Sequence, residues 1–181
     1  MKLYVIRHCE AEGQAPNACL TKSGKLQSER LANFLNDLNI KLVISSPYTR
    51  AFQTIQPFVL HNSIPFKVDD RLKERVLSSE NLSDWYDKLQ LTFNDRDLKF
   101  TGGESSNEAT GRINELVGDL KQHTHKSVAI VTHGNLMSLL LNHYQPHYGF
   151  HEWKQLSNPD VFEIDFGNDQ PIVKRIWQFA V

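Results

Sequence analysis

The sequence contains few cysteines, no long apolar stretch and no excess of charge of either sign. Its 181 residues include only Cys9 and Cys19, which excludes a disulfide framework and offers no paired-cysteine metal site. No apolar run approaches the roughly 20 residues that span a bilayer, and the N-terminus has no signal-peptide pattern. The formal net charge of −1 argues against nucleic acid as a partner. We therefore expect a soluble, cytoplasmic protein whose function resides in a local site.

Short apolar segments alternate with segments of helical periodicity over most of the chain. Strands are predicted at residues 3–6, 41–44, 65–68, 127–131 and 161–166, with a looser one at 172–177. One helix is predicted to begin at residues 21–24, with Thr21 or Ser23 as its N-cap. A second is predicted to have Ser46 as its cap and Pro47 in its first turn, and to run to about Leu60. Further helices are predicted at 106–122 and at 136–142. The last two strands suggest a β-hairpin. This order predicts a single α/β domain over residues 1–181, a three-layer α/β/α sandwich whose mostly parallel sheet has an antiparallel edge.

Charged and polar side chains directly follow the predicted strands. Arg7 and His8 end the first strand, Ser46 follows the second, and His133 follows the strand at 127–131. Right-handed crossovers place the carboxyl ends of parallel strands along one edge of the sheet. We therefore expect these side chains to converge, together with Arg50 from the helix after Ser46.

Two imidazoles and two guanidiniums form a cationic pocket that suits a phosphate group. Arg7 and Arg50 offer planar donor forks that match phosphate oxygens. The amides after His133 open a helix N-terminus, which is a further anion site. A neutral His8 can attack phosphorus and form a phosphohistidine. Because the protein cations supply the stabilising charge, we predict neither a metal nor a cofactor.

The leaving oxygen of a phosphoester needs a proton, and Glu74 follows the third strand at the same sheet edge. A carboxyl group serves as a general acid near neutral pH when burial or negative neighbours favour its protonated form. Glu104 is the competing acid. A surface ion pair with Lys73 or Arg75 is the alternative explanation for Glu74.

Five blocks of the sequence, in the same order along the chain, resemble the histidine phosphatase superfamily, also called the phosphoglycerate mutase-like proteins. Arg7-His8 resembles the Arg-His-Gly signature, and Leu20 to Gln27 resembles the Leu-Thr-x-x-Gly-x-x-Gln helix start. The remaining blocks are Ser45 to Thr54, Asp70 to Glu74, and Val131 to Gly134. Together they cover nearly the whole chain and imply a phosphoglycerate mutase-like fold.

The resemblance also implies roles for individual residues. His8 is the phosphorylated nucleophile, Glu74 is the proton donor, and Arg7, Arg50 and His133 form the phosphate pocket. Gln14 and the backbone amide of Asn135 are further phosphate ligands. The sequence departs from the family pattern at two positions near the nucleophile, where Cys9 replaces the usual Gly and Ala11 the frequent Thr. We expect Cys9 to be a small buried residue rather than an oxidisable thiol.

We predict a metal-independent phosphomonoesterase with a small-molecule phosphoester as substrate. One alternative is a phosphohistidine phosphatase that acts on a phosphoprotein, and another is a phosphoglycerate mutase-type phosphotransferase. The short interval between His8 and Leu20 favours a phosphatase, because mutases carry additional substrate-binding residues there. A non-catalytic phosphate-binding protein is the alternative of a different class, suggested by Cys9 and Ala11.

Residues 75–101 are charged and aromatic and show no clean periodicity apart from one short helix near Trp85. A segment of this kind between regular elements is typical of a flap or lid. We refer to residues 75–101 as the flap segment. Trp85, Tyr86 and Phe93 would give it an apolar face, which favours an organic phosphoester over a bare sugar phosphate.

Overall fold

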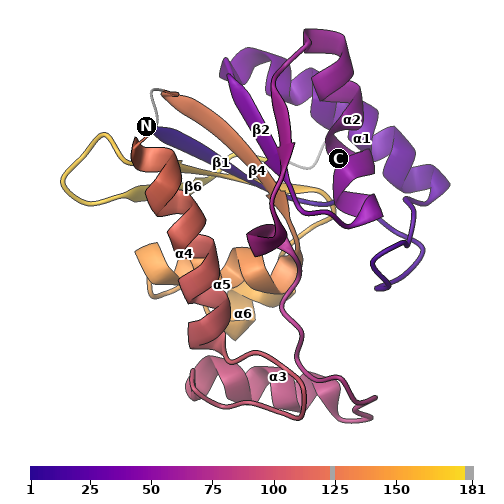
Figure 1. Ribbon diagram of the computed structural model, residues 1–181, viewed down its shortest axis with the longest axis vertical. Coiled ribbons are helices and arrows are strands. Elements are labelled where there is room, and N and C mark those ends of the chain that lie inside the picture. Colours follow the sequence, from indigo (N-terminus) through magenta and orange to yellow (C-terminus); the bar gives the residue numbers. More distant parts are fainter. Residues whose placement is uncertain (123–124, 178–181) are drawn as a thin grey trace.

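The computed structural model describes residues 1–122 and 125–177, and its centre is a six-stranded sheet (Figure 1). The strand order is β3-β2-β4-β1-β5-β6. The first four of these strands are parallel, whereas β5 and β6 form an antiparallel hairpin that pairs with β1. The strands are β1 (Lys2–Arg7), β2 (Leu42–Ser45), β3 (Phe66–Val68), β4 (Ser127–Thr132), β5 (Asp160–Asp165) and β6 (Ile172–Arg175). The predicted mixed sheet with an antiparallel edge is confirmed.

Helices cover both faces of the sheet, which makes three layers. In Figure 1, α1 (Lys22–Leu35) and α2 (Thr49–Asn62) lie on one side, while α4 (Ser106–Gln122) and α5 (Gly134–Tyr144) lie on the other. Successive side chains of β1 point to opposite faces. Leu3 and Val5 pack in the core under α4 and α5, and Tyr4 and Ile6 pack in the core under α1 and α2. A strand buried on both faces explains the continuous apolar run that begins the sequence.

The pairing register brings the carboxyl ends of three central strands level with one another. Arg7 of β1 is paired with Thr132 of β4, and Ser45 of β2 is paired with Val131. The residues that follow these strands, namely His8, Ser46 and His133, therefore leave the sheet side by side. The predicted convergence at one sheet edge is confirmed for these residues.

The observed helix boundaries agree in part with those predicted from the sequence. Thr21 caps α1, because its Oγ1 accepts a hydrogen bond from the Gly24 amide at 2.9 Å. Gly24 is required there, since a Cβ atom would overlap the Glu10 carbonyl oxygen. The prediction that Ser46 caps the next helix was wrong, because α2 begins at Thr49 after Tyr48. Helix α5 begins two residues earlier than predicted, directly after His133, and α6 (Phe150–Lys154) was not predicted.

The flap segment leaves the sheet and carries α3 (Trp85–Asn94), which lies apart from the main body at the bottom of Figure 1. Its ends are held together by a hydrogen bond from the Ser79 amide to the Thr101 carbonyl oxygen at 2.9 Å. The buried Arg75 guanidinium donates to the Glu104 carbonyl oxygen and to Thr92 Oγ1 of α3. Two short 3-10 turns, η1 (Asn36–Leu38) and η2 (Asp70–Leu72), complete the fold.

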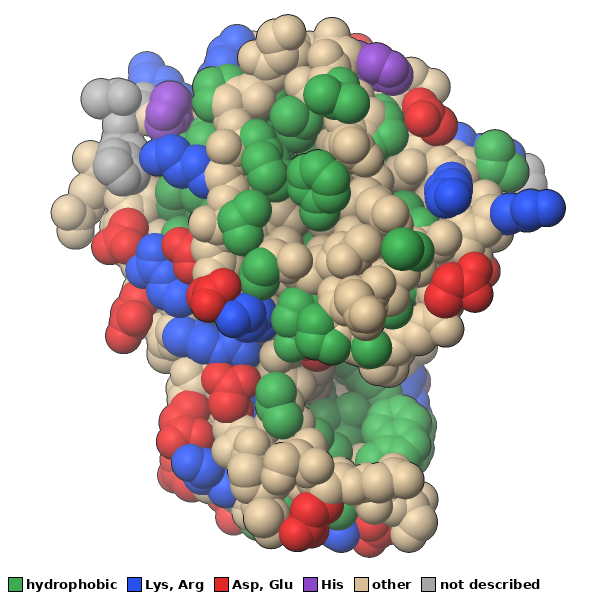
Figure 2. Space-filling view, turned by 45° about the vertical axis from the view of Figure 1, so that its right-hand side comes forward, with side chains coloured by type: hydrophobic (Ala, Val, Ile, Leu, Met, Phe, Trp, Pro, Cys, Tyr) green, Lys and Arg blue, Asp and Glu red, His purple; other side chains and the backbone are tan. Residues whose placement is uncertain are grey.

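The space-filling view shows a hollow where the main body meets the lower part that contains α3 (Figure 2). Hydrophobic side chains gather beside this hollow, whereas charged side chains of both signs are scattered over much of the remaining face. No helix within the described part of the chain is long and apolar enough to cross a membrane.

Candidate active site

His8 lies at the centre of the strand-end cluster, with 7% of its surface exposed. Its Nδ1 is 2.7 Å from the Cys9 carbonyl oxygen, and its Nε2 accepts a hydrogen bond from Arg50 Nε at 3.2 Å. A carbonyl oxygen only accepts and a guanidinium only donates, so these two bonds place the ring proton on Nδ1 and a lone pair on Nε2. Burial lowers the pKa of His8 to about 3, and the charges of Arg50 and Arg7 act in the same direction. His8 is therefore a neutral imidazole near neutral pH.

The two guanidiniums of the site are held by backbone carbonyl groups. Arg50 Nη1 donates to the carbonyl oxygens of Gln14 at 3.1 Å and Ala15 at 2.8 Å. Arg7 Nη1 donates to the Leu156 carbonyl oxygen at 2.9 Å, and its Nε is buried without a partner among the described residues. Burial lowers the pKa of both guanidiniums, and the Glu74 carboxylate opposes this effect at each. The neutral carbonyl partners leave both positive charges available to an anion.

His133 lies beside His8, with the two ring centroids 5.1 Å apart. Its Nε2 is 2.8 Å from Ser46 Oγ, and its Nδ1 is buried without a partner in the described structure. Burial lowers the pKa of His133 well below its usual value, and the positive charge of a protonated His8 or of Arg50 would lower it further. Tyr48 completes this wall, with its ring centroid 4.9 Å from that of His133 and 5.0 Å from the Arg50 guanidinium carbon.

Glu74 caps the N-terminus of α5. Its carboxylate accepts hydrogen bonds from the backbone amides of Asn135 and Leu136, each at 3.0 Å, and from that of Arg75 at 2.8 Å. A helix N-terminus favours negative charge, so in the free protein Glu74 occupies an anion site that a phosphate group would also favour. The backbone amide of Asn135, which is predicted to be a phosphate ligand, donates its hydrogen bond to Glu74 in the free protein.

Glu104, the competing acid, is committed to a different partner. Its two carboxylate oxygens accept from Arg112 Nε at 2.7 Å and Nη2 at 2.8 Å. Burial alone would raise the pKa of Glu104, but the hydrogen bonds and charge of Arg112 outweigh burial and lower it. This carboxylate stays ionised near neutral pH, and its contacts join α4 to the start of the flap segment.

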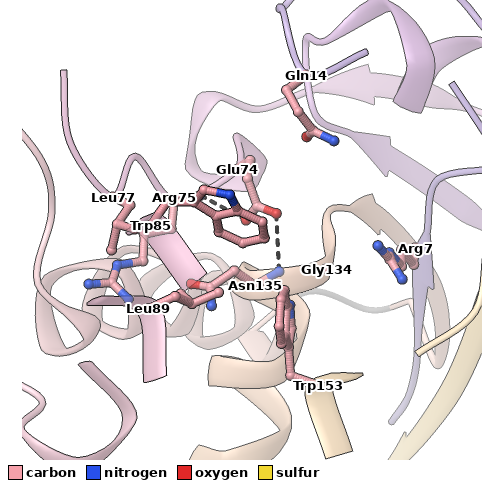
Figure 3. A pocket seen from close by; sticks show the side chains of 10 residues that line it. All are labelled: Arg7, Gln14, Glu74, Arg75, Leu77, Trp85, Leu89, Gly134, Asn135 and Trp153. Carbon is pink, nitrogen blue, oxygen red and sulfur yellow. Dashed lines mark hydrogen bonds between the residues drawn. The ribbon is translucent and has the colours of Figure 1, made fainter. Parts of the chain in front are cut away.

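A cavity of about 430 Å³ opens beside these residues (Figure 3). Arg7, Glu74 and the exposed Gln14 point toward the same space from different sides in this view. Gly134 allows the close approach of Arg7, because a Cβ atom at position 134 would lie 3.1 Å from Arg7 Nε. The structure thus brings together all the predicted site residues: Arg7, His8, Gln14, Arg50, Glu74, His133 and Asn135.

The polar loop before β5 supports the site and was not predicted. Asn158 Nδ2 donates to the His8 carbonyl oxygen at 2.7 Å, and the Ser157 carbonyl oxygen accepts from Arg7 Nη1 at 3.3 Å. The loop is held in turn by the fully buried Asp160, which accepts from the Ser157 amide and is paired with Arg175 at 2.6 Å. Most of these contacts use backbone groups, which leave no recognisable pattern in the sequence.

Cys9 is fully buried beside the nucleophile. Its amide donates to Thr54 Oγ1 at 2.8 Å, and burial raises the pKa of its thiol to about 12. The thiol is therefore protonated near neutral pH and packs as a small core residue, in agreement with the prediction. Among the described residues, no group of three or more His, Cys, Asp or Glu side chains is arranged to hold a metal ion.

The Asn135 side chain is buried, and neither its nitrogen nor its oxygen has a partner among the described residues. We expect Asn135→Leu to raise the free energy of unfolding by about 1 kcal/mol, because an unpaired buried amide is replaced by an apolar group of similar size. Chemical denaturation with urea measures this change.

Asn142, on the same helix, provides the matched control. Its side chain donates to the Pro146 carbonyl oxygen and accepts from Arg96. Asn142→Leu should therefore lower the free energy of unfolding by about 1–2 kcal/mol. Equal destabilisation by the two substitutions would contradict the assignment of Asn135 as an unpaired group.

Two imidazoles and two guanidiniums gathered at one edge of the sheet can bind a phosphate group. The profile of the histidine phosphatase superfamily (branch 1) matches residues 3–178. The chain belongs to this superfamily and is a phosphatase of the histidine phosphatase type.

Individual relatives agree with this assignment. A Schizosaccharomyces pombe protein named "Probable phosphatase" is 28% identical over 163 residues, which cover 83% of this chain and 76% of the relative. A mutant of Entamoeba histolytica phosphoserine phosphatase in complex with phosphoserine superposes with a TM-score of 0.78 at 21% identity, over 96% of this chain and 94% of that one. Mycobacterial glucosyl-3-phosphoglycerate phosphatase in complex with inorganic phosphate superposes with a TM-score of 0.77 at 21% identity, over 99% of this chain and 97% of that one. At these identities the structural likeness shows the fold.

Proposed function

We propose that the protein hydrolyses a small phosphomonoester without a metal, through a phosphohistidine intermediate on His8. The observation that carries the proposal is the hydrogen bonding of the His8 ring. Its ring proton is engaged by the Cys9 carbonyl oxygen, and its Nε2 lone pair faces the cationic pocket. A buried neutral imidazole with one nitrogen unprotonated is a competent nucleophile at neutral pH.

Substrate binding requires two exchanges of partners. Arg50 Nε donates to His8 Nε2 in the free protein, so a phosphate oxygen must take this donor before Nε2 can attack. Glu74 occupies the amides at the N-terminus of α5, so its carboxyl group must turn away before these amides can bind phosphate. Arg7, Arg50, His133 and Gln14 would surround the phosphate, and their donors would stabilise charge on its equatorial oxygens.

In the first chemical step, His8 Nε2 forms a bond to phosphorus as the bond from phosphorus to the ester oxygen breaks. The protonated Glu74 carboxyl group gives its proton to the leaving alkoxide. The bound phosphate supports this protonated form, because a dianion beside a carboxylate disfavours a second negative charge. The hydrogen bond from Nδ1 to the Cys9 carbonyl oxygen stabilises the positive charge that develops on the His8 ring.

In the second step, water attacks phosphorus and the bond to Nε2 breaks. Glu74, ionised after the first step, accepts the proton of the attacking water. Inorganic phosphate then leaves with His8 neutral and Glu74 protonated, as before the first step. Release of this proton to solvent returns Glu74 to the carboxylate of the free protein, and a proton is taken up again when the next substrate binds. The ion pair of Glu104 with Arg112 supports Glu74 rather than Glu104 as the group that carries the proton.

The proposal predicts that a panel of small phosphomonoesters is hydrolysed at full rate in the presence of a metal chelator, because Arg7 and Arg50 supply the stabilising charge and His133 a further hydrogen bond. Release of inorganic phosphate measures this activity. A phosphohistidine-containing peptide and a mutase assay with phosphoglycerate serve as comparisons. Saturable phosphate binding without turnover of any ester would contradict the proposal and favour a non-catalytic phosphate-binding protein.

A further inference from the structure

The cavity beside His8 has two chemically different ends. Arg7, Glu74 and Gly134 line the phosphate end, and the other end is lined by Leu77, Trp85, Leu89 and Trp153. Figure 3 shows the Trp153 ring pointing toward Gly134 and the Trp85 ring lying between Glu74 and Leu89. We call the part between Leu77, Trp85, Leu89 and Trp153 the indole subsite. Because it is continuous with the phosphate end, a group attached to a bound phosphate would extend into it.

The indole subsite is assembled from separate elements that hold one another in place. Trp85 begins α3 of the flap segment, whereas Trp153 belongs to α6. Aromatic contacts join the two, since Tyr86 packs against Trp85 at 5.6 Å and against Phe150 at 5.2 Å between ring centroids. Phe150 in turn stacks on Trp153 at 5.4 Å. The two indoles therefore form a largely pre-arranged apolar wall.

Part of this wall is exposed in the free protein. Half of the Trp85 surface is accessible, although large apolar side chains gain free energy when they leave water. The volume of about 430 Å³ for the whole cavity lies in the range usual for small-molecule sites. A flat apolar group placed against the indoles would cover this surface.

Few charged side chains line the indole subsite. Arg75 also lines the cavity, but all three of its guanidinium nitrogens donate to the Glu104 carbonyl oxygen or to Thr92 Oγ1. Each of these three nitrogens thus already has one partner within the protein. A bisphosphate or an acidic leaving group would find no other Lys or Arg among the lining residues at this end.

We propose that the indole subsite binds the alcohol part of the substrate, and that this alcohol carries a flat, uncharged apolar group. The inference rests on the proposed function for the identity of the ligand as a phosphomonoester. It deepens that function by naming the substrate class, and it assigns Trp85 and Trp153 as specificity-determining residues.

The test separates binding from turnover by using His8→Ala protein, which has no nucleophile. The dissociation constants of 2-phenylethyl phosphate and ethyl phosphate are measured by NMR titration. Their leaving alcohols are similar in acidity, so the comparison isolates the ring. We expect 2-phenylethyl phosphate to bind about 10- to 100-fold more tightly, the gain typical of burying one aromatic ring. Trp153→Ala in the same background should reduce this ratio to below about 3-fold.

Two further variants complete the test. Trp85→Ala changes a half-exposed side chain and should also reduce the ratio of the two dissociation constants. This variant replaces Trp153→Ala in the test if the latter fails to fold. Leu91→Ala, on the same helix but half exposed and outside the cavity lining, should leave the ratio unchanged. Equal binding of the two esters, or a ratio that survives both tryptophan substitutions, would overturn the inference. Tight ring-dependent binding without turnover by the native enzyme would leave the subsite standing and instead refute the proposed hydrolysis.

Discussion

Replacement of His8 by Ala is expected to lower kcat for a phosphomonoester by about 10⁵-fold or more, because it removes the atom that bonds to phosphorus. His133, whose ring centroid is 5.1 Å from that of His8, is expected to remain a phosphate ligand, with its Nε2 held by Ser46 Oγ. Steady-state release of inorganic phosphate by the purified variant measures the effect.

His61→Ala is the matched control for this experiment. His61 is exposed in the last turn of α2, so its removal should leave kcat unchanged. Binding of inorganic phosphate to the His8→Ala variant should persist, because Arg7, Arg50 and His133 remain. A His8→Ala variant that folds, binds phosphate and retains more than about one tenth of the native kcat would refute a nucleophilic role.

Replacement of Glu74 by Gln should have the second largest effect, and this effect should depend on the leaving group. For an alkyl phosphate we expect kcat/KM to fall by about 10²- to 10⁴-fold, the usual contribution of a general acid. For p-nitrophenyl phosphate the loss should be below about 10-fold, because nitrophenolate leaves without a proton. Comparison of kcat/KM for the two esters isolates the step that forms the phosphoenzyme.

Glu104→Gln distinguishes the two candidate acids. Because Glu104 is paired with Arg112, this substitution should lower thermal stability and reduce kcat/KM for both esters by the same factor. If Glu104→Gln gave the leaving-group-dependent loss and Glu74→Gln did not, the roles of the two carboxyl groups would be reversed.

Most of the sheet and its helices could be predicted from the sequence because their patterns are local. The uninterrupted apolar runs at 3–6 and 127–131 identify strands that are buried on both faces, and the structure contains both as the adjacent parallel strands β1 and β4. Thr21 was a recognisable cap for α1. The short helix α6 was missed because its five residues are too few to show helical periodicity.

Ser46 illustrates why the start of α2 could not be predicted from sequence. A Ser followed by Pro is a typical helix start, but here the Ser46 hydroxyl is bonded to His133 and accepts from the Tyr48 amide. A contact between residues 87 positions apart in the chain decided the local structure. The tertiary interaction thus outweighed the local preference, and the helix began two residues later than the capping pattern indicated.

The strand-end residues of the site could also be predicted, because parallel strands deliver their carboxyl ends to one edge. The groups that support them could not. Asn158 and the carbonyl oxygens of Leu156 and Ser157 hold His8 and Arg7 from a loop about 150 residues away. Trp153 likewise reaches the cavity from α6, and nothing in its local sequence indicates this.

Direct observation of the intermediate tests the central claim. Native enzyme is mixed with a phosphomonoester that carries a labelled phosphoryl group, quenched in alkali within a single turnover, and digested for peptide mapping. We predict that the label appears on the peptide containing His8, resists alkali, is lost in acid, and forms at least as fast as kcat. Label on any other residue, or turnover with no covalent label on His8 at any quench time, would contradict the account.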